Sequence, residues 1–83
     1  MLSQKITPCF MEKIEKDKIL IQIGEKISEI RINKNMSLQD VSDICNFEKP
    51  NLVRIEKGRI NFTIGTLVKI ANALDIELKD LIH

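Results

Sequence analysis

The sequence predicts an all-α fold, a compact bundle of about five short helices in one small domain. The chain has 83 residues and a mass of 9.6 kDa, which is enough for one modest hydrophobic core. Apolar residues recur at spacings of three and four, and no segment alternates in the way that a strand does. Residues suited to helix ends separate these apolar segments, so each helix is expected to be short.

Composition excludes several classes of protein. Hydrophobic residues make up 43% and charged residues 30%, which is typical of a soluble globular domain. No apolar run approaches the roughly 20 residues of a membrane span, and the start of the chain lacks the pattern of a signal peptide. We therefore expect a cytoplasmic protein with no membrane partner. Because 13 basic residues face 12 acidic ones, any basic surface must come from arrangement rather than excess.

The first helix is expected over about residues 18–34. Residues 1–18 form an N-terminal arm, either a helical lead-in or a flexible tail, and residues 19–83 form the domain. Gly24 weakens the helix slightly, and Asn35 suits its end because asparagine tolerates the left-handed conformation. The isoleucines that recur on one face are interpreted as core: Ile19, Ile23, Ile27 and Ile30.

A short second helix is predicted over Leu38–Ile44. Ser37 is a good N-cap, and Asp40 is available to the same first turn. The residues expected to face inward are Val41, Ile44 and Cys45. Asn46 then marks a tight turn.

A third helix follows from Pro50 to about Lys57. Proline suits a first turn, where its missing N–H costs nothing, and Gly58 suits the C-terminal end. Leu52 and Ile55 are expected to face inward. Two short helices joined by a tight turn form a helix-turn-helix unit.

Two more helices complete the predicted bundle. Thr63 is expected to cap a fourth helix, which ends at Asp75. A final short helix carries Leu78, Leu81 and Ile82.

The residues that catalysis or metal binding needs are scarce. His83, the last residue, is the single histidine, so no Cys or His cluster predicts a zinc site. Cys9 and Cys45 are interpreted as free thiols in a reducing compartment. There is no glycine-rich phosphate loop and no nucleophile elbow. We expect no enzyme, no cofactor and no metal.

Residues 41–58 resemble the Cro/phage-repressor-like helix-turn-helix family, also called the XRE family. The strongest signature is Arg54-Ile55-Glu56-Lys57-Gly58, and the resemblance extends from about Ile19 to Ile82. It implies a lambda-repressor-like fold. The positions that depart from the family pattern are Leu38 for glutamine, Ser42 for alanine, Asn46 for the turn glycine, Glu48 for serine or threonine, and Phe62 for proline.

The resemblance implies that the third helix enters the major groove of double-stranded DNA with its N-terminal half first. Its outward residues include Val53 and the expected base contacts, Lys49, Pro50, Asn51 and Arg54. Arg54 can bind guanine through two hydrogen bonds, and Asn51 could pair with adenine or contact a phosphate. Phosphate contacts are expected from Ser37, Gln39, Lys57 and Arg59. The plain alternative is that the basic side chains are solvated surface charges.

Three charged residues have a different interpretation. In the family, an arginine of the first helix and a glutamate that ends the third form a partly buried ion pair, which implies a structural pair between Arg31 and Glu56. Glu48 is interpreted as a charge that interacts with the helix dipole, and a less favoured alternative is that it accepts a hydrogen bond from cytosine.

The main functional hypothesis is a sequence-specific DNA-binding transcriptional regulator, a repressor or autoregulator that binds a palindromic operator as a homodimer. The dimer surface could use the N-terminal arm or the C-terminal residues Ile76, Leu78, Leu81 and Ile82, although Leu78 and Leu81 are expected rather to complete the monomer core. An alternative is an antitoxin that binds a toxin partner and its own promoter. A third hypothesis is a structural helical module that does not bind DNA.

Overall fold

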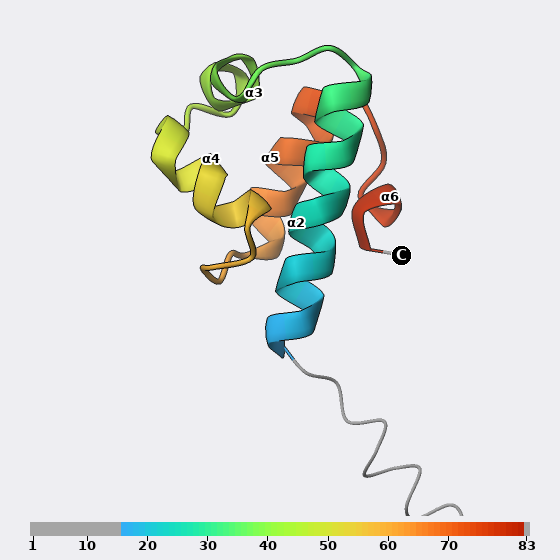
Figure 1. Ribbon diagram of the computed structural model, residues 1–83. Coiled ribbons are helices and arrows are strands. Elements are labelled where there is room, and N and C mark those ends of the chain that lie inside the picture. The colour runs from blue at the N-terminus through green and yellow to red at the C-terminus, as the bar shows by residue number, and fades with distance from the viewer. Residues whose placement is uncertain (1–15, 83) are drawn as a thin grey trace, which may run out of the picture.

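Five helices and no strand make up the part of the chain that the computed structural model describes, residues 16–82 (Figure 1). The predicted all-α fold is therefore confirmed. The helices are α2 (Lys16–Asn33), α3 (Leu38–Cys45), α4 (Lys49–Glu56), α5 (Ile64–Leu74) and α6 (Lys79–Ile82). No helix of this range is long and apolar enough to cross a membrane. Most of the predicted arm, together with Cys9 and His83, lies outside the described residues.

The longest helix, α2, runs along the bundle, with α4 and α5 on one side of it and α6 on the other (Figure 1). It contacts α4, α5 and α6, while α3 packs against α4 and α5. Every helix contributes to a single core, whose most deeply buried apolar side chains are Ile27, Val41, Leu52, Ile70, Leu74 and Leu81. This arrangement leaves α3 and α4 on one side of the molecule, each with one face buried and one face in solvent (Figure 1).

Left-handed backbone follows four of the described helices. Asn35, Asn46 and Asp75 have φ near 60°, and Gly58 has φ of 70°. At each of these positions, the backbone N–H of that residue or of the next one donates to a carbonyl of the preceding helix. One example is Phe47 N, which donates to Ser42 O at 2.8 Å. The sequence signals for these four helix ends are thus confirmed.

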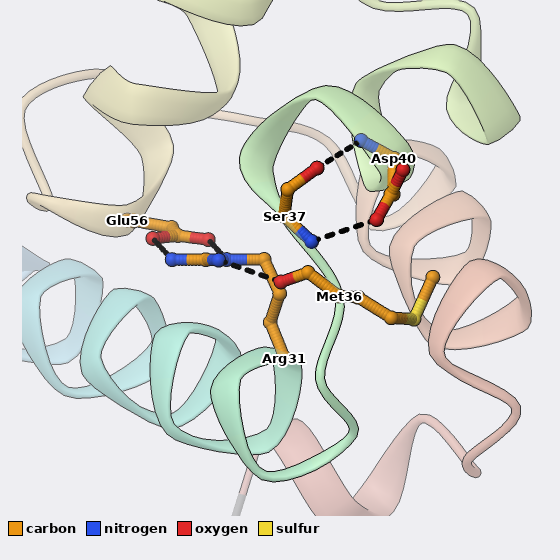
Figure 2. A network of polar contacts seen from close by, with 5 residues as sticks. All are labelled: Arg31, Met36, Ser37, Asp40 and Glu56. Atoms are coloured by element: carbon orange, nitrogen blue, oxygen red, sulfur yellow. Dashed lines mark hydrogen bonds and ion pairs between the residues drawn. The ribbon is translucent and has the colours of Figure 1, made fainter.

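The N-terminal caps of α3 and α5 are also those that the sequence predicts. Ser37 Oγ accepts from Asp40 N at 2.9 Å, and Ser37 N donates to Asp40 Oδ2 at 2.9 Å (Figure 2). The backbone N–H of Ser37, then its hydroxyl, lower the pKa of Asp40, because both stabilise the carboxylate. Thr63 Oγ1 accepts from Thr66 N at 3.2 Å.

Two isoleucines expected in the core are exposed. Ile44 is 60% exposed because α3 turns Val41, Ser42 and Cys45 toward the core, which places Ile44 on its flank. Ile19 is 37% exposed, since the first turns of α2 extend beyond the other helices (Figure 1).

The C-terminal apolar residues divide between core and surface. Leu81 is buried, and Ile76 and Leu78 pack against the core. The interpretation that Leu78 and Leu81 complete the monomer is therefore confirmed, while Ile82 is 51% exposed.

Candidate nucleic-acid interface

The two faces of α4 differ sharply in exposure. Leu52 and Ile55 are buried in the core at 0% and 3% exposure. Val53, expected to point outward, is half-buried. On the opposite side lie four exposed residues, named here the reading face: Lys49, Pro50, Asn51 and Arg54.

The turn before α4 holds that helix against α3. Asn46 takes the left-handed conformation that lets the chain reverse direction within a few residues. Phe47 packs against the core, and the ammonium of Lys69 lies 5.9 Å from the centroid of its ring. This turn therefore sets the angle at which α4 leaves α3.

The N-terminus of α4 has no side-chain cap. Glu48 occupies the N-cap position, and its carbonyl accepts from Asn51 N at 2.9 Å and from Leu52 N at 3.3 Å. Its carboxylate makes no capping hydrogen bond and lies exposed. Pro50 stands in the first turn, as predicted, where it removes a donor that would otherwise need a partner. The start of the reading face thus carries one negative charge.

The C-terminal end of α4 lies directly on α2, because two glycines allow the approach. A Cβ on Gly24 would lie 2.4 Å from Glu56 O and 2.5 Å from Ile55 O. A Cβ on Gly58 would lie 2.7 Å from the Cα of Ile21. Any larger residue at either position would have to push backbone away from backbone.

An ion pair joins α2 to the last residue of α4 (Figure 2). Arg31 Nε donates to Glu56 Oε2 at 2.7 Å, and Nη2 donates to Oε1 at 3.2 Å. Arg31 Nη1 also donates to the carbonyl of Met36 at 2.8 Å, just before α3 begins. The two side chains are only 11% and 9% exposed. The pair expected from the sequence is present, and it fixes α4 relative to the entry into α3.

The residues expected to contact phosphates lie exposed at two places. Ser37 and Gln39 begin α3, whereas Lys57 and Arg59 follow the end of α4. Ser37 Oγ already accepts the capping hydrogen bond from Asp40 N, so this side chain is engaged in the cap of α3. Gln39 Nε2 donates to Asp43 Oδ1 at 2.8 Å, which places a carboxylate next to this expected contact.

Comparison with known proteins places this geometry in a family. Residues 24–83 match the family model described as a helix-turn-helix domain. The control protein C.BamHI of Bacillus amyloliquefaciens is 32% identical over 65 residues, which span 77% of this chain and 80% of that protein. The chain belongs to the helix-turn-helix family. It is a DNA-binding transcriptional regulator.

Two further relatives agree with this membership. The restriction-modification controller protein C.AhdI from Aeromonas hydrophila has a solved structure with a TM-score of 0.73 and 27% identity, over 75% of this chain and 94% of that chain. The HTH-type transcriptional regulator DdrOP3 of Deinococcus deserti is 27% identical over 63 residues. This helix-turn-helix regulator spans about half of DdrOP3, with 49% of that protein covered.

The helix-turn-helix regulator keeps its one described thiol out of solvent. Cys45 is 5% exposed, and its Sγ donates to Lys69 O at 3.5 Å. Burial raises the pKa of the Cys45 thiol, although the charge of Lys69 acts in the opposite direction. Within residues 16–82 no three His, Cys, Asp or Glu side chains gather as a metal site would require.

Sequence reasoning missed the close approach at Gly24. It treated this glycine as a small loss of helix propensity, whereas the structure needs it for contact between α2 and α4. The available signal was a glycine in the middle of a strong helical pattern, where packing is the usual reason to keep one.

Proposed function

We propose that this regulator acts in the cytoplasm as a homodimer, binding a palindromic operator to repress or autoregulate the genes it controls. Each copy inserts the N-terminal half of α4 into the major groove. Two copies then occupy half-sites about one helical turn, roughly 34 Å, apart. One domain of this size offers few base contacts, so two copies supply the selectivity that one lacks.

The observation that carries this proposal is the reading face. A helix buried along Leu52 and Ile55 presents Lys49, Asn51 and Arg54 to solvent, on the side away from the core. An exposed helix of this width fits the major groove, where hydrogen-bonding side chains can meet base edges. The formal charge of the whole chain is only +1, so this local arrangement supplies the attraction to DNA.

The proposed roles of the site residues follow from their positions. The reading face, Lys49, Pro50, Asn51 and Arg54, meets the bases. Ser37 and Gln39 at the start of α3, together with Lys57 and Arg59 past α4, meet phosphates and fix the register on the duplex.

The relatives support a controller rather than an antitoxin. C.BamHI is named a control protein, and C.AhdI is named a restriction-modification controller. We therefore propose that this chain controls genes through its operator, as the names of these two relatives describe control. Neither of these names points to a toxin partner.

The test selects bound sequences from a random DNA pool with the wild-type chain. We expect a palindrome with half-sites one helical turn apart. Arg54→Ala should lose about 1–3 kcal/mol of discrimination at a guanine of each half-site. Lys57→Ala should weaken binding to all DNA alike and reduce the salt slope of the dimer by about 2, one phosphate contact from each copy. Lys79→Ala, which removes an exposed cation from α6, is the control.

Two results would contradict the proposal. The first is a selection that returns no preferred sequence at low salt. The second is an Arg54→Ala variant that binds the selected operator as tightly and selectively as the wild type.

A further inference from the structure

The side chain of Arg54 is held by a neighbour on the reading face. Arg54 Nη1 donates to Asn51 Oδ1 at 3.2 Å. The two residues are three apart on α4, so they lie on the same side of the helix, and both are exposed. Arg54 would otherwise be a long side chain free to adopt many rotamers in solvent.

This hydrogen bond leaves the opposite edge of the guanidinium available. An arginine side chain has five N–H groups in a rigid planar fork. Asn51 engages Nη1, and among the described residues neither Nε nor Nη2 of Arg54 has a hydrogen-bond partner. Two parallel donors on one edge are what the O6 and N7 acceptors of guanine require.

Asn51 contacts Arg54 and also lines a surface depression. Its side chain lines a depression beside Phe47, Phe62 and Thr66, on the flank of α4 that faces α5. A carboxamide that gives its oxygen to Arg54 no longer presents the donor–acceptor pair with which asparagine binds adenine.

We infer that Asn51 is a positioning residue, which holds the Arg54 guanidinium so that its Nε–Nη2 edge reads a guanine. This inference rests on the proposed function and changes one role in it: Asn51 acts on a base through Arg54 and does not contact a base directly. The gain in affinity comes from rotamer freedom that Arg54 has already lost before DNA arrives.

The experiment is a double-mutant cycle on the operator that the wild-type chain selects from a random pool. Asn51→Ala should weaken binding about three- to tenfold for each half-site, the cost of immobilising one long side chain in each copy. The loss should occur at the guanine where Arg54→Ala acts. When 7-deazaguanine, which lacks the N7 acceptor, replaces that guanine, wild type and Asn51→Ala should bind with the same affinity. In the Arg54→Ala background, Asn51→Ala should have no further effect.

Asn72→Ala is the matched control, since it makes the same substitution at an exposed position on α5. Thermal unfolding of each variant checks that α4 stays folded. An Asn51→Ala effect that adds fully to that of Arg54→Ala, or that falls on a different base pair, would show a direct base contact and overturn the inference alone. Failure of the wild-type chain to select any DNA would overturn the proposed function and the inference with it.

Discussion

The C-terminal end of α4, its inner end, is crowded against α2, whereas the reading face, its outer face, is exposed to solvent. Where α4 meets α2, two glycines bring backbone against backbone, and the Arg31–Glu56 pair closes the contact. On the reading face, the structure gives Arg54 one exposed hydrogen bond to Asn51. The inner contacts determine where the helix lies, and the outer side chains determine what it can bind. The residues that aim the reading face are thus not the ones that would touch DNA.

The largest expected effect is loss of the inner ion pair. Arg31→Ala leaves Glu56 almost buried and without its charged partner, so the free energy of unfolding should fall by about 3–5 kcal/mol. Urea unfolding measures this change. The control is Lys26→Ala, which breaks an exposed pair with Glu29 and should cost less than about 0.5 kcal/mol. Equal losses in the two variants would show that the inner pair does not stabilise α4.

Next in size is the glycine contact between α2 and α4. Gly24→Ala should lower the free energy of unfolding by about 1–3 kcal/mol despite a better helix propensity, because the new methyl meets backbone carbonyls that cannot rotate away. Gly65→Ala in α5 is the control, since its Cβ would meet only Thr63 Oγ1 at 3.5 Å. That variant should keep or gain stability. A Gly24→Ala variant as stable as the wild type would contradict the interpretation that the contact between α2 and α4 is crowded.

A stabilising change is expected inside α3. Ser42 is fully buried, and its hydroxyl has no hydrogen-bond partner within residues 16–82. Ser42→Ala should therefore raise the free energy of unfolding by about 1–2 kcal/mol, the cost of an unpaired buried hydroxyl. Ser28→Ala in α2, at a half-buried position, should change stability less. A loss of stability in Ser42→Ala would mean that this hydroxyl finds a partner.

The smallest effect concerns the outer face. Glu48→Thr would give α4 a side-chain cap and remove a negative charge, so stability should rise by up to about 1 kcal/mol. Binding to all DNA should tighten severalfold, as gel shifts across a salt series would measure. Glu25→Gln on α2 removes the same charge elsewhere and serves as the control. A change of preferred base instead would favour the cytosine contact for Glu48.

The sequence predicts local features of this fold better than contacts between helices. Ser37, Asn46 and Gly58 each act on the few residues around them, and their caps and turns are found where the pattern places them. The prediction that Ile44 faces the core is wrong, because an eight-residue helix has too few apolar positions to define its buried face. Gly24 is missed because only the path of α4 reveals what a side chain there would strike.

The candidate site divides in the same way. The resemblance to phage repressors places Lys49 and Arg54 on an exposed helix face, which the structure reproduces. The hydrogen bond between Arg54 and Asn51 depends on rotamers, which no spacing rule specifies. Whether these side chains meet bases is a prediction that the selection experiment decides.

The left-handed residues at the ends of the helices also bear on how quickly the protein folds. Asn35, Asn46, Gly58 and Asp75 each reverse the chain through hydrogen bonds to carbonyls only a few residues back. Each corner can therefore form before distant parts of the chain meet, and helical proteins rich in such local contacts fold in about microseconds to milliseconds. Such a chain would then be ready to bind DNA almost as soon as it leaves the ribosome.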